Sequence, residues 1–175
     1  MRIFKNIFFI LFFFSISISS LKAQEKVSFI DIDYILASSV AGKSLLNKLN
    51  AEEKLKINFF RSEDEEFKKK ENNILAKKKL ISKEEINKEL KSLQIEFNEY
   101  RKDKIKQIDE LKAKRNRNIV NFFKLLNPII EKYMSDNSIY MLIDKKNVFI
   151  ANKDYDITNN LIELINNQIK NIEIK

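Results

Sequence analysis

The chain has 175 residues, with 33 Lys and Arg against 25 Asp and Glu, a formal net charge of +8, and neither histidine nor cysteine. These absences remove disulfides, thiol chemistry, the usual general base and the commonest metal ligand, and leave carboxylates alone for acid–base or metal chemistry. Gly42 is the single glycine, which excludes glycine-rich phosphate loops, dinucleotide folds and nucleophile elbows.

The first 23 residues have the pattern of a secretory signal peptide. Two basic residues precede an apolar run at residues 7–18 that is interrupted by two serines, and Ala23 offers a small residue before Gln24. A membrane anchor is the alternative, but a spanning helix needs about 20 apolar residues and this run is shorter. We therefore expect cleavage between Ala23 and Gln24, which leaves a mature chain with a net charge of +5.

A short strand and then a helix are predicted directly after the signal. Residues 26–30, KVSFI, alternate and are β-branched or aromatic, as is typical of a strand, and either Asp31 or Asp33 can cap the helix that follows. The letters GKS at Gly42 resemble the end of a phosphate-binding loop, but that pattern requires a second glycine at Ala37. We instead interpret Gly42 as a joint where a short helix ends and a longer one begins.

Long helices are predicted from residue 43 to about residue 126, because this stretch is densely charged and has neither proline nor glycine. Two thin apolar stripes run along it. The first stripe repeats every seven residues and consists of Phe60, Phe67, Ile74 and Ile81. The second follows coiled-coil spacing with one slip and consists of Ile86, Leu90, Leu93, Phe97, Ile105, Ile108, Leu111 or Lys112, Arg115, Ile119, Phe122 and Leu126.

A turn is predicted between the two stripes. Ser82 and Glu85 have the spacing of a capping box, which marks the start of a new helix. The simplest arrangement is an antiparallel helical hairpin that turns near residues 80–82, with the stripes facing each other. At about 1.5 Å per residue, about 40 residues give an arm on the order of 60 Å long.

The C-terminal third returns to mixed structure. Pro128 should end or kink the second long helix, and two strands are expected at residues 139–143 and 148–151 around a tight turn. Asp156 or Thr158 then caps a last amphipathic helix. The apolar face of that helix consists of Leu161, Ile162, Leu164, Ile165 and Ile169.

The predicted strands lie at the two ends of the mature chain, so a sheet forms only if these ends meet. The fold class is therefore α+β, a small β-containing body with a long antiparallel, coiled-coil-like helical hairpin as its arm. The domains are a signal peptide at 1–23, a body at 24–45 plus 118–175, and an arm at 46–117.

Two stretches frame the hairpin: VSFIDIDYILASSVAGKSLLNKL at the mature start and YMLIDKKNVFIANKDYDITNNLIELIN near the end. The strand that ends at an Asp, the G-K step in a helix and the D-I-T helix start resemble the Skp/OmpH family of periplasmic outer-membrane-protein chaperones. The hairpin between them resembles the family only in its general composition and apolar spacing. A glycine that the family commonly places before the second strand is absent, and we expect Asn137 to replace it, because Asn tolerates a positive φ.

The resemblance implies a homotrimer in which three bodies share a β-barrel-like core and three arms surround a cavity. It implies an ATP-independent periplasmic holdase, without cofactor or enzymatic activity, that encloses unfolded outer-membrane proteins and prevents their aggregation before membrane insertion. A body of roughly 70 residues with exposed sheet edges independently favours oligomerisation. The candidates for the shared core, which could also form an ordinary intrachain core, are Val27, Phe29, Leu142, Ile143, Val148 and Phe149.

Lysine is concentrated around the expected arm tip. Residues 68–91 hold nine Lys against four Glu, an excess equal to the net charge of the mature chain. The lysines either form a solvated helix face or contact an anionic partner such as an acidic client, lipid headgroups or lipopolysaccharide. The candidates are Lys68, Lys69, Lys70, Lys77, Lys78 and Lys79.

The alternative function is a basic coiled-coil protein that binds an anionic surface or nucleic acid. The tip has Lys without Arg and no aromatic stacking platform, which together with the export signal argues against nucleic acid. An enzyme would need a catalytic constellation, and we find none. Asp31, Asp33 and Asp144 could meet as a metal-binding cluster, but capping of helices and strand ends is the preferred interpretation.

Overall fold

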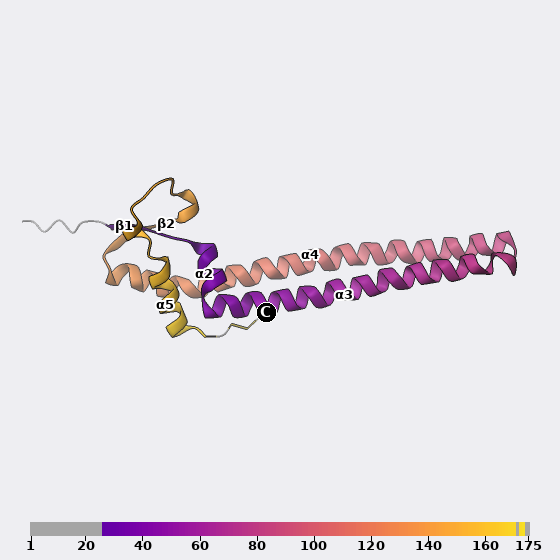
Figure 1. The fold of residues 1–175 in the computed structure, drawn as a ribbon, viewed down its shortest axis with the longest axis horizontal. Helices are drawn as coiled ribbons and strands as arrows, with labels where there is room; N and C mark the ends of the chain where they lie inside the picture. The colour runs from indigo at the N-terminus through magenta and orange to yellow at the C-terminus, as the bar shows by residue number, and fades with distance from the viewer. Residues whose placement is uncertain (1–25, 171, 174–175) are drawn as a thin grey trace, which may run out of the picture.

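The computed structural model describes residues 26–170 and 172–173, and shows a small body from which a long helical hairpin projects (Figure 1). The expected signal peptide and the Ala23–Gln24 cleavage site lie outside the described residues. The predicted α+β class with a helical arm is confirmed. The elements are β1 Lys26–Ile30, α2 Ile32–Ser38, α3 Val40–Ala76, η1 Lys77–Lys79, α4 Lys83–Asp136, β2 Ile139–Asp144, η2 Lys145–Asn147, η3 Lys153–Tyr155 and α5 Thr158–Gln168. None of the described helices is long and apolar enough to cross a membrane.

The sheet joins the two ends of the mature chain, as predicted from the positions of the expected strands. β1 and β2 are parallel, with Val27 opposite Met141 and Phe29 opposite Ile143. On the other edge of β1, the Ile157 N–H donates to the Phe29 carbonyl oxygen at 3.1 Å, in a single bridge. The part of the chain that the structure describes therefore has a sheet of only two strands.

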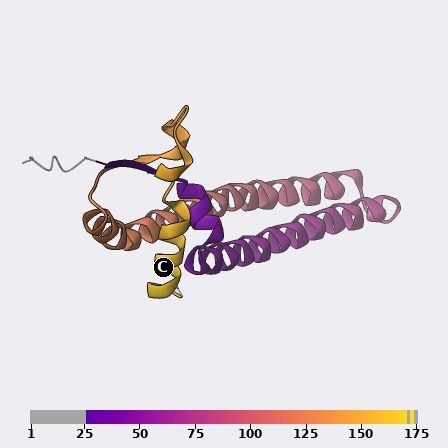
Figure 2. The same cartoon turned by 60° about the vertical axis from the view of Figure 1, so that its left-hand side comes forward.

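The expected strand at residues 148–151 is wrong. The chain forms the short 3₁₀ helix η2 after β2 and then an irregular loop that stands out from the body (Figure 2). A strand requires a neighbouring edge for its backbone hydrogen bonds, and the single chain gives this apolar segment none. Val148 is partly buried, whereas Phe149 and Ile150 are 101% and 86% exposed.

The predicted joint between a short and a long helix is present, but it lies at Ser39. This residue is extended, and its Oγ accepts a hydrogen bond from the Gly42 N–H at 3.1 Å, which caps α3. Gly42 lies in the first turn of α3. A Cβ atom there would lie 2.0 Å from the Leu36 carbonyl oxygen, so the glycine permits the close approach of α2 and α3.

The core lies where α2, α5 and the body-proximal ends of α3 and α4 meet. The predicted apolar face of α5 is confirmed: Leu161 and Ile165 are fully buried, and the other three residues pack partly buried against the core. The largest fully buried side chains are Phe122, Ile35, Leu45, Leu126, Leu161 and Ile165. Both arm helices are thus anchored in the body at their bases.

Two expectations about the end of α4 have a different outcome in the structure. Of the two alternatives for Pro128, the end of the helix is wrong, because α4 continues to Asp136 with the proline inside it. The positive φ before β2 belongs to Ser138, at 54°, whereas Asn137 has a φ of −110° and forms the C-cap of α4. The Asn137 side chain donates to the Tyr133 carbonyl oxygen at 2.8 Å. Because that bond uses Asn137 to close the helix, the left-handed turn falls on the next residue.

We predict that Gly42→Ala destabilises the body on the order of 3 kcal/mol, because the added methyl group would collide with the backbone of Leu36. Urea unfolding followed by circular dichroism would measure the change. Lys43→Ala, at the exposed neighbouring position, is the control and should shift stability by less than about 0.5 kcal/mol. Equal stability of Gly42→Ala and the wild type would show that α2 and α3 can move apart freely.

Candidate functional site

The candidate site has two parts, the arm and the exposed apolar surface of the body. In the middle of the arm, the rings of Phe67 and Phe97 lie 5.1 Å apart across the hairpin, and Tyr100 lies 5.1 Å from Phe67. Phe60, about two helical turns nearer the body on α3, is buried. The expectation that the two stripes face each other is therefore confirmed in this region.

A polar network continues the aromatic cluster toward the body. The Tyr100 hydroxyl lies 2.9 Å from Asp64 Oδ1 and 3.1 Å from the Phe60 carbonyl oxygen, and Lys104 Nζ lies 2.7 Å from Asp64 Oδ2. The hydrogen bond from Lys104 is the main cause that lowers the pKa of Asp64. Burial and the neighbouring Asp64 carboxylate raise the pKa of Tyr100, so its hydroxyl remains protonated as a donor.

Sequence reasoning missed Tyr100 and Lys104, which fill the apparent slip in the second stripe. Ile105, assigned to the stripe, is 58% exposed and points away from α3. The spacing Phe97, Tyr100, Lys104, Ile108 continues a helical face without interruption. A lysine in this face is hard to recognise by hydropathy, since its role depends on an aspartate 40 residues earlier.

Ion pairs link the two helices outside the aromatic cluster. Toward the body, Lys114 Nζ lies 2.8 Å from Glu52 Oε1 and Arg115 Nη1 lies 3.4 Å from Glu53 Oε2. Toward the tip, Lys70 pairs with Glu96 at 2.5 Å and Lys77 with Glu89 at 3.0 Å. These side chains are largely solvated, so each pair contributes about 1 kcal/mol or less. The arm is consequently held by a thin seam and several weak links.

The tip turns as predicted from the capping box. Ser82 Oγ accepts from the Glu85 N–H at 3.2 Å, and Glu85 Oε2 accepts from the Ser82 N–H at 3.0 Å. Ser82 Oγ also donates to Glu85 Oε2 at 2.8 Å, and this bond, followed by the one from the Ser82 N–H, lowers the pKa of the Glu85 carboxyl. Leu80, in the turn, is among the most exposed large apolar side chains. The turn thus has a defined backbone but no interior.

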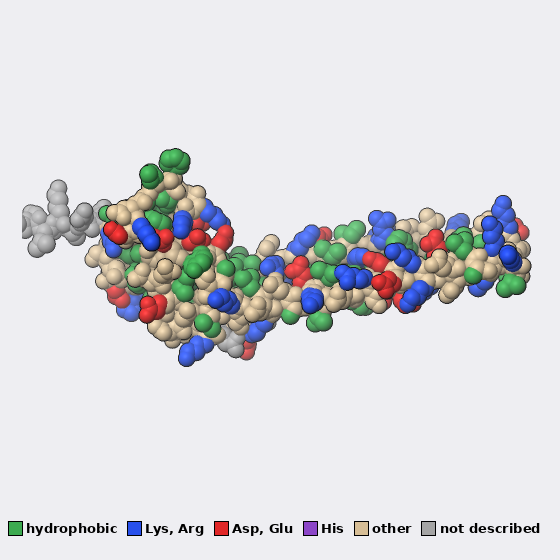
Figure 3. Space-filling model, viewed as in Figure 1, with side chains coloured by type: hydrophobic (Ala, Val, Ile, Leu, Met, Phe, Trp, Pro, Cys, Tyr) green, Lys and Arg blue, Asp and Glu red, His purple; other side chains and the backbone are tan. Residues whose placement is uncertain are grey.

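All six candidate lysines are exposed, and basic side chains gather at the far end of the arm (Figure 3). Three are in ion pairs: Lys70 and Lys77 across the hairpin, and Lys69 with Glu66 on its own helix at 2.7 Å. The remaining three form no ion pair with any described residue, and they are Lys68, Lys78 and Lys79. The set therefore divides into lysines that hold the arm together and lysines whose charge is available.

The structure divides the six candidate core residues of the body. Phe29 is buried, and Leu142, Ile143 and Val148 are partly buried. Val27, at 42%, and Phe149 are exposed. An open groove of about 790 Å³ lies between β1 and the 148–155 loop, and its apolar lining includes Val27, Phe29, Ile143, Val148 and Ile150.

One further feature of this surface was not visible in the sequence. Ser28, on β1, lines the same groove, and its Oγ is buried without a hydrogen-bond partner among the described residues. A buried hydroxyl without a partner costs about 1–3 kcal/mol. The groove thus combines unburied apolar area with an unsatisfied polar atom.

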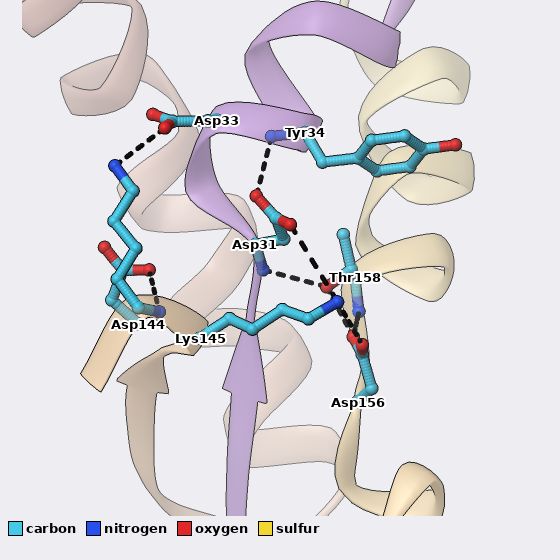
Figure 4. Close-up of polar contacts among 8 residues, drawn as sticks. Asp31, Asp33, Tyr34, Asp144, Lys145, Asp156 and Thr158 are labelled. Carbon is cyan, nitrogen blue, oxygen red and sulfur yellow. Dashed lines mark hydrogen bonds and ion pairs between the residues drawn. The ribbon is translucent and has the colours of Figure 1, made fainter. Parts of the chain in front are cut away.

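The aspartates at the strand ends act as caps and ion-pair partners (Figure 4). Asp31 Oδ1 accepts from the Tyr34 N–H at 2.9 Å and caps α2, and Asp144 Oδ1 accepts from the Lys146 N–H at 3.1 Å. Lys146 Nζ lies 2.7 Å from Asp33 Oδ2. The capping interpretation is confirmed for Asp31 and Asp144, whereas Asp33 forms an ion pair. No group of His, Cys, Asp and Glu among the residues described could hold a metal ion.

The same cluster ties the start of α5 to the end of β1. The Thr158 Oγ1 accepts from the Asp31 N–H at 2.9 Å, while Asp156 Oδ1 accepts from the Thr158 N–H at 3.1 Å. Lys145 Nζ lies 3.4 Å from Asp156 Oδ2 and 3.9 Å from Asp31 Oδ2. Asp156 thus serves the first turn of α5, although Ile157 occupies the formal N-cap position.

A small body with a parallel strand pair and one long helical hairpin defines a class of arm-bearing α+β proteins. Residues 26–165 match the model of the family described as outer membrane protein (OmpH-like). Since this match spans most of the sequence, the chain belongs to the OmpH-like family, and the resemblance noted in the sequence is confirmed.

Among solved structures, the fold is similar to a crystal structure from Caulobacter crescentus CB15 of an OmpH-like protein described as a candidate outer membrane chaperone. The TM-score is 0.76 and the identity 19%, over 85% of this chain and 88% of that one. A likeness at this identity establishes the fold. No curated protein matches the sequence. Family membership and fold together support a chaperone-type function.

We predict that Asp64→Asn weakens the arm by up to about 1 kcal/mol at neutral pH, because it removes the charge that pairs with Lys104. The lowered pKa of Asp64 means that this stability is present above the ordinary value of 3.8 and is lost as the pH falls through the folded-state pKa. The free energy of unfolding of wild type and variant, measured from about pH 2 to about pH 7, should therefore become equal at the acidic end.

Asp154→Asn is the control for this experiment, because Asp154 is exposed and forms no ion pair with the described residues. It should leave the pH dependence unchanged. A wild-type pH profile in Asp64→Asn would mean that Lys104 and Tyr100 hold the arm without the carboxylate.

Proposed function

We propose that the protein is an ATP-independent periplasmic holdase that encloses unfolded outer-membrane proteins between helical arms before their insertion. The observation that carries this proposal is the arm surface, on which isolated apolar side chains are exposed among charges. The exposed apolar residues of the arm are Leu55, Ile57, Phe59, Leu75, Leu80, Ile95 and Ile105. Scattered contacts of this kind can hold an unfolded chain by many weak interactions without burying it irreversibly.

The proposal includes a homotrimer with the body as its centre. Ile150 lines the groove beside β1, and the neighbouring Phe149 is fully exposed. The single chain therefore leaves both the groove and this apolar segment uncovered. Partner chains that cover the groove would bury this apolar area and give the 148–151 segment a strand edge. Val27, Phe29 and Ile143 would then belong to a shared core.

The proposal places the mature protein in the periplasm, released by cleavage after Ala23. Its partners are unfolded outer-membrane β-barrel proteins, and the mechanism needs no cofactor and no catalytic residue. Lys68, Lys78 and Lys79 would add long-range attraction to acidic segments of a client or to anionic lipid or lipopolysaccharide. These free charges also favour the second candidate function, a basic protein that binds an anionic surface, whereas specific nucleic-acid binding lacks a stacking platform.

We predict that the mature protein is trimeric at micromolar concentration and that Phe149→Lys shifts it toward monomer, because charge cannot be buried in an apolar shared core. Analytical ultracentrifugation would measure the shift, and light scattering of an outer-membrane β-barrel diluted from urea without nucleotide would measure holdase activity. Leu80→Lys makes the same chemical change at the exposed arm tip and should leave assembly unchanged. A stable monomer that suppresses aggregation fully would disprove enclosure.

We predict that replacing Lys68, Lys78 and Lys79 with Gln slows association with a net-acidic client, most clearly at low salt, and leaves dissociation nearly unchanged. These three lysines are chosen because Lys70 and Lys77 also link the arm helices. Stopped-flow mixing across a salt series would separate the two rates.

The control for the lysine experiment carries the same change in net charge. Lys54 and Lys102 lie nearer the body and Lys124 lies within it; all three are exposed and form no ion pair with the described residues. Their replacement with Gln should slow association less than the tip substitutions. Equal slowing in both variants would assign the effect to net charge, and no slowing in either would leave the tip lysines as a solvated surface.

A further inference from the structure

A cavity of about 460 Å³ lies between the two arm helices close to the body. Its apolar lining consists of Leu49, Ile57, Phe60, Ile108 and Leu111. Leu49 and Phe60 are buried, so one wall belongs to the packed seam. The cavity belongs to a single hairpin and therefore requires neither an assembled oligomer nor a captured client. Its volume lies within the range of about 300–1,000 Å³ that small-molecule sites occupy.

Ion pairs border the cavity along the arm. At the body side, Lys114 pairs with Glu52 and Arg115 with Glu53, and at the tip side Lys104 pairs with Asp64. No other acid of the described part of the chain lines the cavity, so each lining carboxylate there is already neutralised by a lining cation.

Two cations remain at the rim, Arg61 and Lys112. Lys112 has one partner at 3.5 Å, the exposed Asp109, which does not line the cavity. Arg61 forms no ion pair with any residue that the structure describes. The rim thus presents an excess of positive charge beside an apolar interior, and its arginine carries a fork of donors suited to a carboxylate.

We propose that this cavity binds a single-chain amphiphilic monocarboxylate. The alkyl chain lies between α3 and α4 against Ile57, Ile108 and Leu111, and the carboxylate pairs with Arg61. Apolar burial supplies most of the affinity, at about 25 cal/mol per Å² of apolar surface removed from water, while the arginine selects the sign of the head group. Ile57 is the one lining residue that also belongs to the exposed apolar side chains proposed to hold clients. Because the cavity lies within a single hairpin and its occupation is measured without a client, the site stands or fails independently of the holdase function.

Occupation of the cavity would also change the arm. The two helices pack weakly here, because the space between them replaces side-chain contacts. A ligand that fills the space and binds only the closed hairpin stabilises it by mass action. The arm would consequently become more resistant to unfolding when the ligand is present.

The test uses the full mature protein and dodecanoate below its micelle concentration, with binding measured by isothermal titration calorimetry. We expect one saturable site per chain, an affinity at least about tenfold weaker for Arg61→Gln, and weaker binding of the cationic dodecyltrimethylammonium. Ile108→Trp, which fills the cavity, should abolish binding while circular dichroism shows the helices retained. Because Arg61 is exposed, its variant tests the site even if Ile108→Trp does not fold.

Arg117→Gln is the matched control, since Arg117 lies on α4 beside the cavity-lining Lys114 and Arg115 but lines a different groove. It should bind dodecanoate as the wild type does. Binding that is not saturable, equal affinity for the cationic amphiphile, or an unchanged affinity in Arg61→Gln would overturn the proposal. A loss of affinity in Arg117→Gln equal to that in Arg61→Gln would also overturn it, because general electrostatic attraction would then suffice.

Discussion

The parallel pairing of β1 with β2 is the constraint on which the rest of the structure depends. Parallel strands cannot be joined by a tight turn and need a crossover connection, and here that connection is α2, α3 and α4. The crossover leaves the body and returns to it, so both arm helices begin or end in the core. Leu45 on α3 and Phe122 on α4 are fully buried at these bases, and they fix the direction in which the arm projects.

The same sheet is too small to complete a body. Two strands bury little apolar area, and a strand pair of this size is marginal without packing against other elements. Ile30 of β1 and Ile139 of β2 join the core that also contains Leu161 of α5, while the side that carries Val27 and the 148–151 loop stays open. The apolar residues of the body therefore fall into two groups, one in the internal core between the helices and one on the exposed surface beside the strands.

Local signals in the sequence were sufficient where one segment determines its own structure. The capping box at Ser82, the β1 pattern and the face of α5 each rest on neighbouring residues, and each is present in the structure. Two of the failures involve a distant or absent partner. The 148–151 segment has strand composition but no edge to join, and Lys104 belongs to the seam because Asp64 lies opposite, which no hydropathy pattern contains. The candidate site was predicted as a set of exposed lysines, but their division into paired and free charges required coordinates.

Packing along the arm is uneven, and this has a mechanical consequence. Phe122 is fully buried at the base and Ile86 is buried beside the tip, whereas a cavity interrupts the seam between them and Leu80 in the turn is exposed. Because local opening costs least where the fewest apolar contacts break, the turn opens before the base. A holdase built in this way can adapt its distal arm to clients of different size while the body keeps its geometry.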